Sequence, residues 1–168
     1  LRRGRGERVG RSPRRWLLAI VLTLSTHPLL DALTVYGTQL RWPFDEPPTM
    51  WSTLFIIDPA YTIWLVVACI VALATRDAVR ARRALLAGIV LSSAYLGWSI
   101  VAKGLVERVA GPSLAAMGLA DAPRFSVASP FNTLLWRVVA MTPEGYVIGD
   151  RSLLADHGPI RWRRVASD

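Results

Sequence analysis

Long apolar runs alternate with short polar or basic stretches along the first two thirds of the chain. The apolar residues fill three segments, 16–40, 54–74 and 84–102. The second and third segments have about the length that an α-helix needs to cross the hydrocarbon core of a bilayer. The first is interrupted at His27 and Pro28, and because proline lacks the N–H of a helical hydrogen bond, we expect this helix to kink or end near Thr26. The pattern predicts about three membrane-embedded helical segments.

The pattern changes after residue 110, where proline and polar residues become frequent. Residues 133–141 and 146–150 are rich in strand-forming side chains and flank a turn signal at Pro143, Glu144 and Gly145. They predict an antiparallel hairpin over residues 133–150. We therefore expect a mainly α protein, a membrane helical bundle of about three hydrophobic segments with a small C-terminal extension that contains a β-hairpin. The expected domains are a basic connector over 1–15, a membrane-embedded helical region over 16–110 and a polar extension over 111–168.

Composition and charge support a membrane protein. The chain is 52% hydrophobic and carries a net charge of +8, a combination that is unusual for a soluble domain. Basic residues crowd 2–15 and 76–83, which we expect on the cytoplasmic side, with 41–53 and 111–168 on the other side. Membrane lipid is the expected partner. Residues 1–15 could bind nucleic acid by charge, but they lack aromatic side chains and adjoin an apolar helix, so nucleic-acid binding is not expected.

Two ionisable residues in the first apolar segment are candidates for chemistry. His27 and Asp31 are four residues apart, so their side chains can converge on one side of a helix. Imidazole and carboxylate groups are suitable ligands for Zn, Mn or Fe. Thr34 could add a hydroxyl group on the same face. Two ligands do not complete a metal site, and the alternative is that His27 and Asp31 cap a helix and pair with each other at the membrane interface.

Asp58 is the next candidate, because it is the one formal charge of the second apolar segment. An aspartate directly before a proline at a helix start is often an N-cap, so a structural role stands beside a catalytic one. Lys103 and Glu107, also four residues apart, are expected to form an interfacial ion pair rather than to act in catalysis. The sequence contains no Gly-x-Ser-x-Gly, P-loop or His-Glu-x-x-His signature.

Four stretches together resemble the family of bacterial inner-membrane metal-dependent hydrolases, also described as LexA-binding and membrane-associated. Residues 25–38 read Ser-Thr-His-Pro-Leu-Leu-Asp-Ala-Leu-Thr-Val-Tyr-Gly-Thr, and 42–44 read Trp-Pro-Phe. Residues 55–62 read Phe-Ile-Ile-Asp-Pro-Ala-Tyr-Thr, and 130–139 read Pro-Phe-Asn-Thr-Leu-Leu-Trp-Arg-Val-Val. The sequence lacks the His-Arg-Gly-x-Thr-His-Ser stretch typical of this family. We therefore expect the chain to be a fragment that holds part of the metal site.

The resemblance implies a membrane-embedded hydrolase in a multi-pass protein of the bacterial inner membrane. His27 and Asp31 would bind a divalent metal ion, expected to be zinc, and Asp58 would be a further ligand, an orienting group or the general base. A lipid-linked or phosphoester substrate would suit a site at membrane depth. The alternative is a non-enzymatic membrane scaffold or regulatory protein, whose polar cluster is structural and whose surface binds a protein partner.

Overall fold

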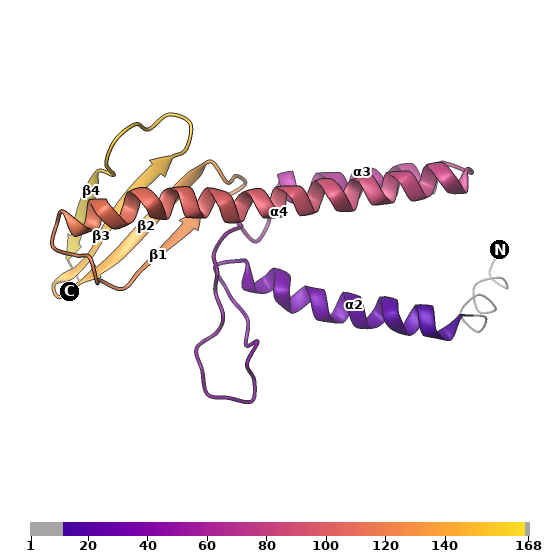
Figure 1. The fold of residues 1–168 in the computed structure, drawn as a ribbon, viewed down its shortest axis with the longest axis horizontal. Coiled ribbons are helices and arrows are strands. Elements are labelled where there is room, and N and C mark those ends of the chain that lie inside the picture. The colour runs from indigo at the N-terminus through magenta and orange to yellow at the C-terminus, as the bar shows by residue number, and fades with distance from the viewer. Residues whose placement is uncertain (1–11, 167–168) are drawn as a thin grey trace.

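The computed structural model describes residues 12–166, in which three helices precede a four-stranded antiparallel sheet (Figure 1). Helix α2 (Pro13–Ala32) is followed by a long loop, by α3 (Pro59–Ala74) and by α4 (Ala78–Ala115). The sheet contains β1 (Arg124–Ala128), β2 (Leu135–Thr142), β3 (Gly145–Ser152) and β4 (Trp162–Ala166), which pair in the order β1-β2-β3-β4. The C-terminal part of helix α4 lies across the sheet, and its N-terminal part lies along α3, so it connects the two parts of the molecule.

Helices α3 and α4 form an antiparallel pair held by close backbone approach. Asp77 begins α4 as its N-cap and accepts a hydrogen bond from the Val79 N–H at 2.8 Å. At Gly88 the helices are so close that an added Cβ would lie 2.4 Å from the Ala68 Cβ. One turn further along, the Ser92 hydroxyl donates a hydrogen bond to the carbonyl oxygen of Tyr61. Small side chains therefore allow the two helices to pack closely.

The buried stripe of α4 continues beyond α3 and becomes the surface on which the sheet packs. Ala102, Val106 and Ala110 are fully buried against a cluster that includes Trp136 and Val138 of β2. A second cluster joins Leu114 to the sheet residues Ala140 and Val147. The sheet thus covers α4 with one face, and its other face lies open.

The predicted hairpin over 133–150 is confirmed. Strands β2 and β3 pair antiparallel from Leu135↔Ser152 to Thr142↔Gly145, with Pro143 and Glu144 in the turn. The hairpin is the centre of a larger element, because β1 and β4 pair on its two sides.

The predicted bundle of three membrane-embedded segments is wrong. Among residues 12–166, α4 is the single helix that is long and apolar enough to cross a membrane by length and composition. Helix α3 has 16 residues because the apolar run from residue 54 begins as a loop and becomes helical at Pro59. At 1.5 Å per residue, α3 is about 24 Å long, shorter than the roughly 30 Å core of a bilayer. A multi-pass arrangement is therefore not supported.

Two local expectations also differ from the structure. Of the predicted kink or end of the first helix near Thr26, the end is wrong, because α2 continues through Pro28 to Ala32. The basic stretch 76–83 is not a loop, since α4 begins at Ala78 and its first turns carry Arg80, Arg82 and Arg83. Of the connector predicted over residues 1–15, residues 1–11 lie outside the described part of the chain.

Candidate functional site

The histidine and aspartate of α2 form the exposed pair that their spacing predicts. His27 Nε2 lies 3.6 Å from Asp31 Oδ2, and their side chains are 77% and 49% exposed. Thr34 does not offer its hydroxyl group to the pair, because that group donates a hydrogen bond to the Asp31 carbonyl oxygen at 2.8 Å and is part of the end of α2. The pair is therefore a two-donor group, one imidazole and one carboxylate, near the C-terminal end of the helix.

Asp58 lies in a different environment from this pair. Its side chain is 2% exposed, and its Oδ1 caps α3 by accepting hydrogen bonds from the N–H groups of Ala60 at 2.9 Å and Tyr61 at 3.3 Å. Its second oxygen, Oδ2, accepts a hydrogen bond from the Tyr95 hydroxyl at 2.9 Å. Both oxygens of Asp58 are thus occupied, which is how a carboxylate is made tolerable in a buried position.

The hydrogen bond from Tyr95 is the first link of a chain that reaches the sheet. The Thr133 hydroxyl donates to the Tyr95 oxygen at 3.2 Å and accepts from Trp98 Nε1 at 3.1 Å. The carbonyl oxygen of Thr133 accepts from Trp136 Nε1 at 2.8 Å. This polar chain joins the start of α3, the middle of α4 and the start of β2. It was not predicted, because the hydrogen bonds of Tyr95 and Trp98 to Asp58 and Thr133 join residues that are 35 or more positions apart in sequence. The one local signal was a tyrosine hydroxyl in an apolar segment.

A second polar junction lies one or two turns further along α4. The Lys103 ammonium group donates hydrogen bonds to the carbonyl oxygens of Trp51 and Ser126, the latter at 3.2 Å. Glu107 accepts from the Ser126 hydroxyl at 2.6 Å and pairs with Arg124 Nε at 3.1 Å. The predicted ion pair of Lys103 with Glu107 is therefore replaced by separate contacts of each residue with the long loop or β1. Lys103 fastens that loop and the sheet to the same turn of α4.

Ser52, beside this junction, has an unusual backbone and side chain. Its φ of 50° lies in the left-handed region, which is uncommon for residues other than glycine. The residue is 1% exposed, and its hydroxyl group has no hydrogen-bond partner among the described residues. The neighbouring N–H groups of Trp51 and Thr53 bond to the carbonyl oxygens of Ala32 and Leu33 at 2.7 Å, which holds the loop against the end of α2.

The residues predicted to form one site are thus brought together only in part. His27 and Asp31 are paired, whereas Asp58 belongs to the contacts of α3, α4 and the sheet. Within residues 12–166, no three His, Cys, Asp or Glu side chains come together in a group that could hold a metal ion.

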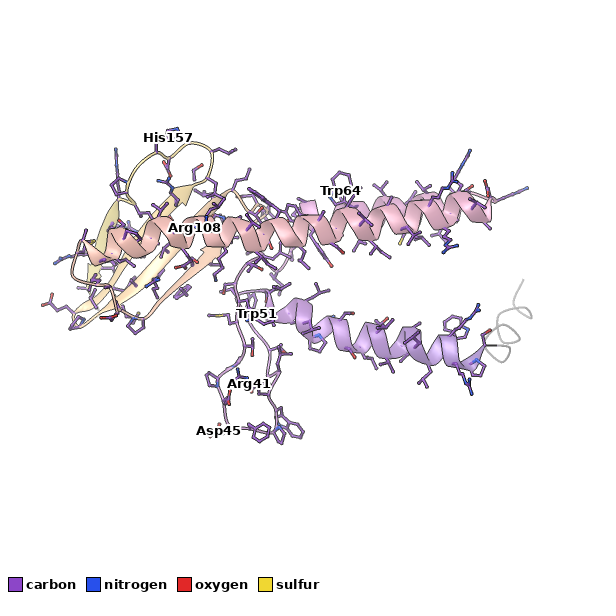
Figure 2. All side chains as sticks on the ribbon, in the orientation of Figure 1. Arg41, Asp45, Trp51, Trp64, Arg108 and His157 are labelled. Carbon is purple, nitrogen blue, oxygen red and sulfur yellow. The ribbon has the colours of Figure 1, made fainter. Side chains whose placement is uncertain are left out.

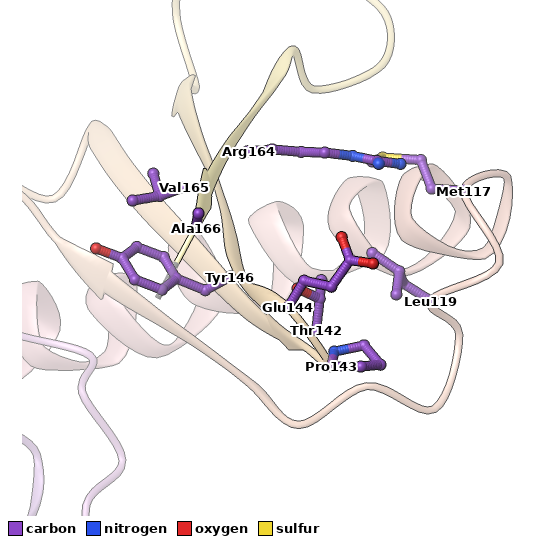
Figure 3. A pocket seen from close by; sticks show the side chains of 9 residues that line it. All are labelled: Met117, Leu119, Thr142, Pro143, Glu144, Tyr146, Arg164, Val165 and Ala166. Carbon is purple, nitrogen blue, oxygen red and sulfur yellow. The ribbon is translucent and has the colours of Figure 1, made fainter. Parts of the chain in front are cut away.

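A pocket of about 290 Å³ lies at the far end of the sheet and contains none of these residues (Figure 3). It is lined by the turn between β2 and β3, strand β4 and the segment after α4. Arg164 extends along one side toward Met117, and Glu144 also lines the pocket. Its position on the sheet separates it from the polar chain at Tyr95.

The fold and its surface define the class of protein. A long apolar helix carries a sheet on its C-terminal half, and its N-terminal half together with α2 and α3 exposes many large apolar side chains, as expected of a membrane-associated protein. The chain belongs to the YdjM inner membrane protein family, whose model matches residues 4–106. The match reaches residue 106, in the C-terminal part of α4, and ends before the sheet. Neither a curated protein nor a solved structure of significant similarity was found.

Proposed function

We propose that this inner-membrane protein is a metal-dependent hydrolase in which His27 and Asp31 bind a divalent metal ion. The observation that carries the proposal is the 3.6 Å separation of His27 Nε2 and Asp31 Oδ2 on an exposed helix surface. Donor atoms this close can both reach one ion with bonds of about 2 Å. The resemblance of residues 25–38 and 55–62 to metal-dependent hydrolases supports the same assignment.

The chemistry of the two donors fits zinc, which binds neutral imidazole and carboxylate oxygen. When bound, such an ion supplies a water of lowered pKa and polarises the oxygen of a substrate. Both residues would be direct ligands, because they are four residues apart on one helix and their side chains converge. Because no group of three His, Cys, Asp or Glu side chains is found among the described residues, water, substrate or residues outside 12–166 would fill the other positions of the ion.

The place of the pair suggests which substrates would reach it. His27 and Asp31 lie where the apolar helix α2 gives way to the loop that follows it. A lipid-linked molecule or a phosphoester at the membrane surface could approach such a position. By the positive-inside rule, the arginine-rich start of α4 lies in the cytoplasm and the sheet lies on the opposite side.

A catalytic role for Asp58 stays a prediction. As a general base or a ligand, Asp58 would have to give up the hydrogen bond from Tyr95, because Oδ1 already caps α3. Its present contacts are those of a residue that positions α3 against α4.

Metal content of the purified protein tests the proposal. Wild type should retain about one Zn²⁺ per chain, and His27→Ala and Asp31→Asn should each lose most of it. The matched control is His157→Ala, which removes the only other histidine and lies in the loop between β3 and β4. Hydrolysis of a chromogenic phosphodiester should fall with the metal. Equal metal content in wild type and His27→Ala would exclude the site.

One observation favours a second function, that of a scaffold for a protein partner. The open face of the sheet exposes apolar side chains from two strands, among them Phe125 and Met141. The resemblance to proteins described as LexA-binding also points to a partner. The scaffold would be supported if the protein held no metal and hydrolysed no phosphodiester. The double variant Phe125→Ser with Met141→Ser should then lose a partner that wild type binds.

A further inference from the structure

The loop between α2 and α3 carries a closed hairpin with a fixed base. Thr38 and Thr49 exchange both backbone hydrogen bonds, at 3.0 and 2.8 Å. Gly37 allows this approach, because it has a φ of 66° and a Cβ added there would lie 2.8 Å from the Thr49 carbonyl oxygen. Residues 38–49, called here the loop hairpin, therefore project as a defined unit instead of a loose connection.

The tip of the loop hairpin exposes two large aromatic side chains. Trp42 is 79% exposed and Phe44 is 71% exposed. An ion pair between Arg41 and Glu46 closes the tip, and the Phe44 N–H bonds to the Arg41 carbonyl oxygen at 2.9 Å. Figure 2 shows Asp45 at the far end of the loop hairpin, away from the rest of the protein. The local structure thus holds the aromatic rings outward, where they contact little of the protein.

The height of the loop hairpin along α4 is set by Lys103. This residue directly follows the uncharged run 84–102, and its ammonium group binds the carbonyl oxygen of Trp51, two residues after the loop hairpin ends. Residues 84–102 are about as long as a bilayer core is thick, so Lys103 marks the level at which α4 leaves it. In Figure 1 the loop hairpin points sideways from this level, away from α4 instead of along it. It therefore extends along the membrane surface.

We propose that the loop hairpin is an interfacial anchor whose Trp42 and Phe44 enter the headgroup region of the leaflet on the sheet side. Aromatic rings are enriched at this depth, where an apolar body and a polar edge are both accommodated. The charges of the loop hairpin are Arg41, Asp45 and Glu46, which carry no net positive charge to attract anionic lipid. Binding therefore depends on ring insertion, and a zwitterionic lipid surface suffices.

Fluorescence of the whole chain reconstituted in phosphatidylcholine vesicles tests the anchor. In a Cys69→Ala background, Phe44→Cys or Trp42→Cys carries an environment-sensitive nitrobenzoxadiazole label. The control is Leu154→Cys in the loop between β3 and β4, because Leu154 is 71% exposed, as is Phe44. We expect blue-shifted emission at positions 42 and 44 that is quenched by lipids with a shallow nitroxide, and aqueous, unquenched emission at 154. Adding phosphatidylglycerol should leave the signals unchanged.

Three results would overturn the anchor. Aqueous emission at both 42 and 44 would place the tip in solvent. A blue shift without quenching by lipid would place it against protein, either a partner or a second copy. A signal that requires phosphatidylglycerol would assign the contact to charge instead of the aromatic rings.

Discussion

The Tyr95 hydroxyl donates a hydrogen bond to the carboxylate of Asp58 at 2.9 Å, which ties the middle of α4 to the residue that begins α3. Asp58 is buried, and Tyr95 also accepts a hydrogen bond from Thr133 before the second strand. One phenol group therefore holds the helix pair and the sheet in register.

Removing the Tyr95 hydroxyl group should weaken the contacts that join α3, α4 and the sheet. Tyr95→Phe leaves one Asp58 oxygen without its partner, which should cost about 2 kcal/mol and lower the thermal midpoint by several degrees. The control is Tyr61→Phe, since no hydrogen bond of the Tyr61 hydroxyl is found among the described residues. Equal midpoints for the two variants in detergent would show that the Tyr95 hydrogen bond contributes little.

Two substitutions separate the structural role of Asp58 from a catalytic one. Asp58→Asn keeps an oxygen that can cap α3 but replaces the acceptor for Tyr95 with an amide N–H, so its thermal midpoint should fall less than that of Asp58→Ala. Asp58→Ala removes the cap and the acceptor for Tyr95 and should cost roughly 2–3 kcal/mol. Thermal scans measure both effects. A stable Asp58→Asn variant that has lost phosphodiester hydrolysis would establish a catalytic role, and one with full activity would exclude it.

The close approach at Gly88 predicts an unusual sensitivity to a single methyl group. A Cβ at this position would meet the Ala68 Cβ at 2.4 Å and the Trp64 carbonyl oxygen at 2.9 Å, so Gly88→Ala should force the helices apart and cost about 1–3 kcal/mol. Gly97→Ala is the matched control on the same helix, because a Cβ there meets nothing within 4 Å. That variant should gain up to about 1 kcal/mol from helix propensity. The thermal midpoint should therefore fall in Gly88→Ala and rise in Gly97→Ala, relative to wild type.

Lys103 should control the order of the loop before α3. Lys103→Met keeps the length of the side chain but removes the hydrogen bonds to Trp51 and Ser126. Amide hydrogen exchange should then accelerate in residues 51–54 and, to a smaller extent, in β1, because each loses one hydrogen bond to α4. Arg108→Met, an exposed change on the same helix, should leave these rates unaltered. Identical exchange in both variants would argue against the fastening role.

Local features of the fold could be predicted from the sequence, and distant ones could not. The β2–β3 hairpin, the capping position of Asp58 and the approach of His27 to Asp31 each depend on residues within a few positions of one another. Strand β4 was missed because the adjacent Arg163 and Arg164 break the apolar pattern. They belong to an edge strand, where charged side chains are common.

The length of α4 was underestimated for a related reason. Lys103, Glu107 and Arg108 end the uncharged run, so the predicted segment stopped at residue 102. The helix nevertheless continues to Ala115, because Val106 and Ala110 pack against the sheet. That packing depends on a surface that is formed later in the chain. In the candidate site, likewise, the sequence predicted the approach of His27 to Asp31 within one turn of α2, but not the long-range contacts of Asp58.

Because α4 is one continuous helix, the number of residues between its two packing surfaces fixes the direction in which the sheet lies about the helix axis, called here its heading. The same helix packs on α3 at Gly88 and on the sheet from Ala102 onward, with no hinge between them. Each residue of an α-helix advances the chain by 1.5 Å and turns it by about 100°. One residue inserted between these two surfaces would swing the sheet by more than a quarter turn about the helix axis, whereas four would nearly restore its heading and lift it by about 6 Å. A change in the length of a loop elsewhere would leave the orientation of the sheet about the α4 axis unchanged.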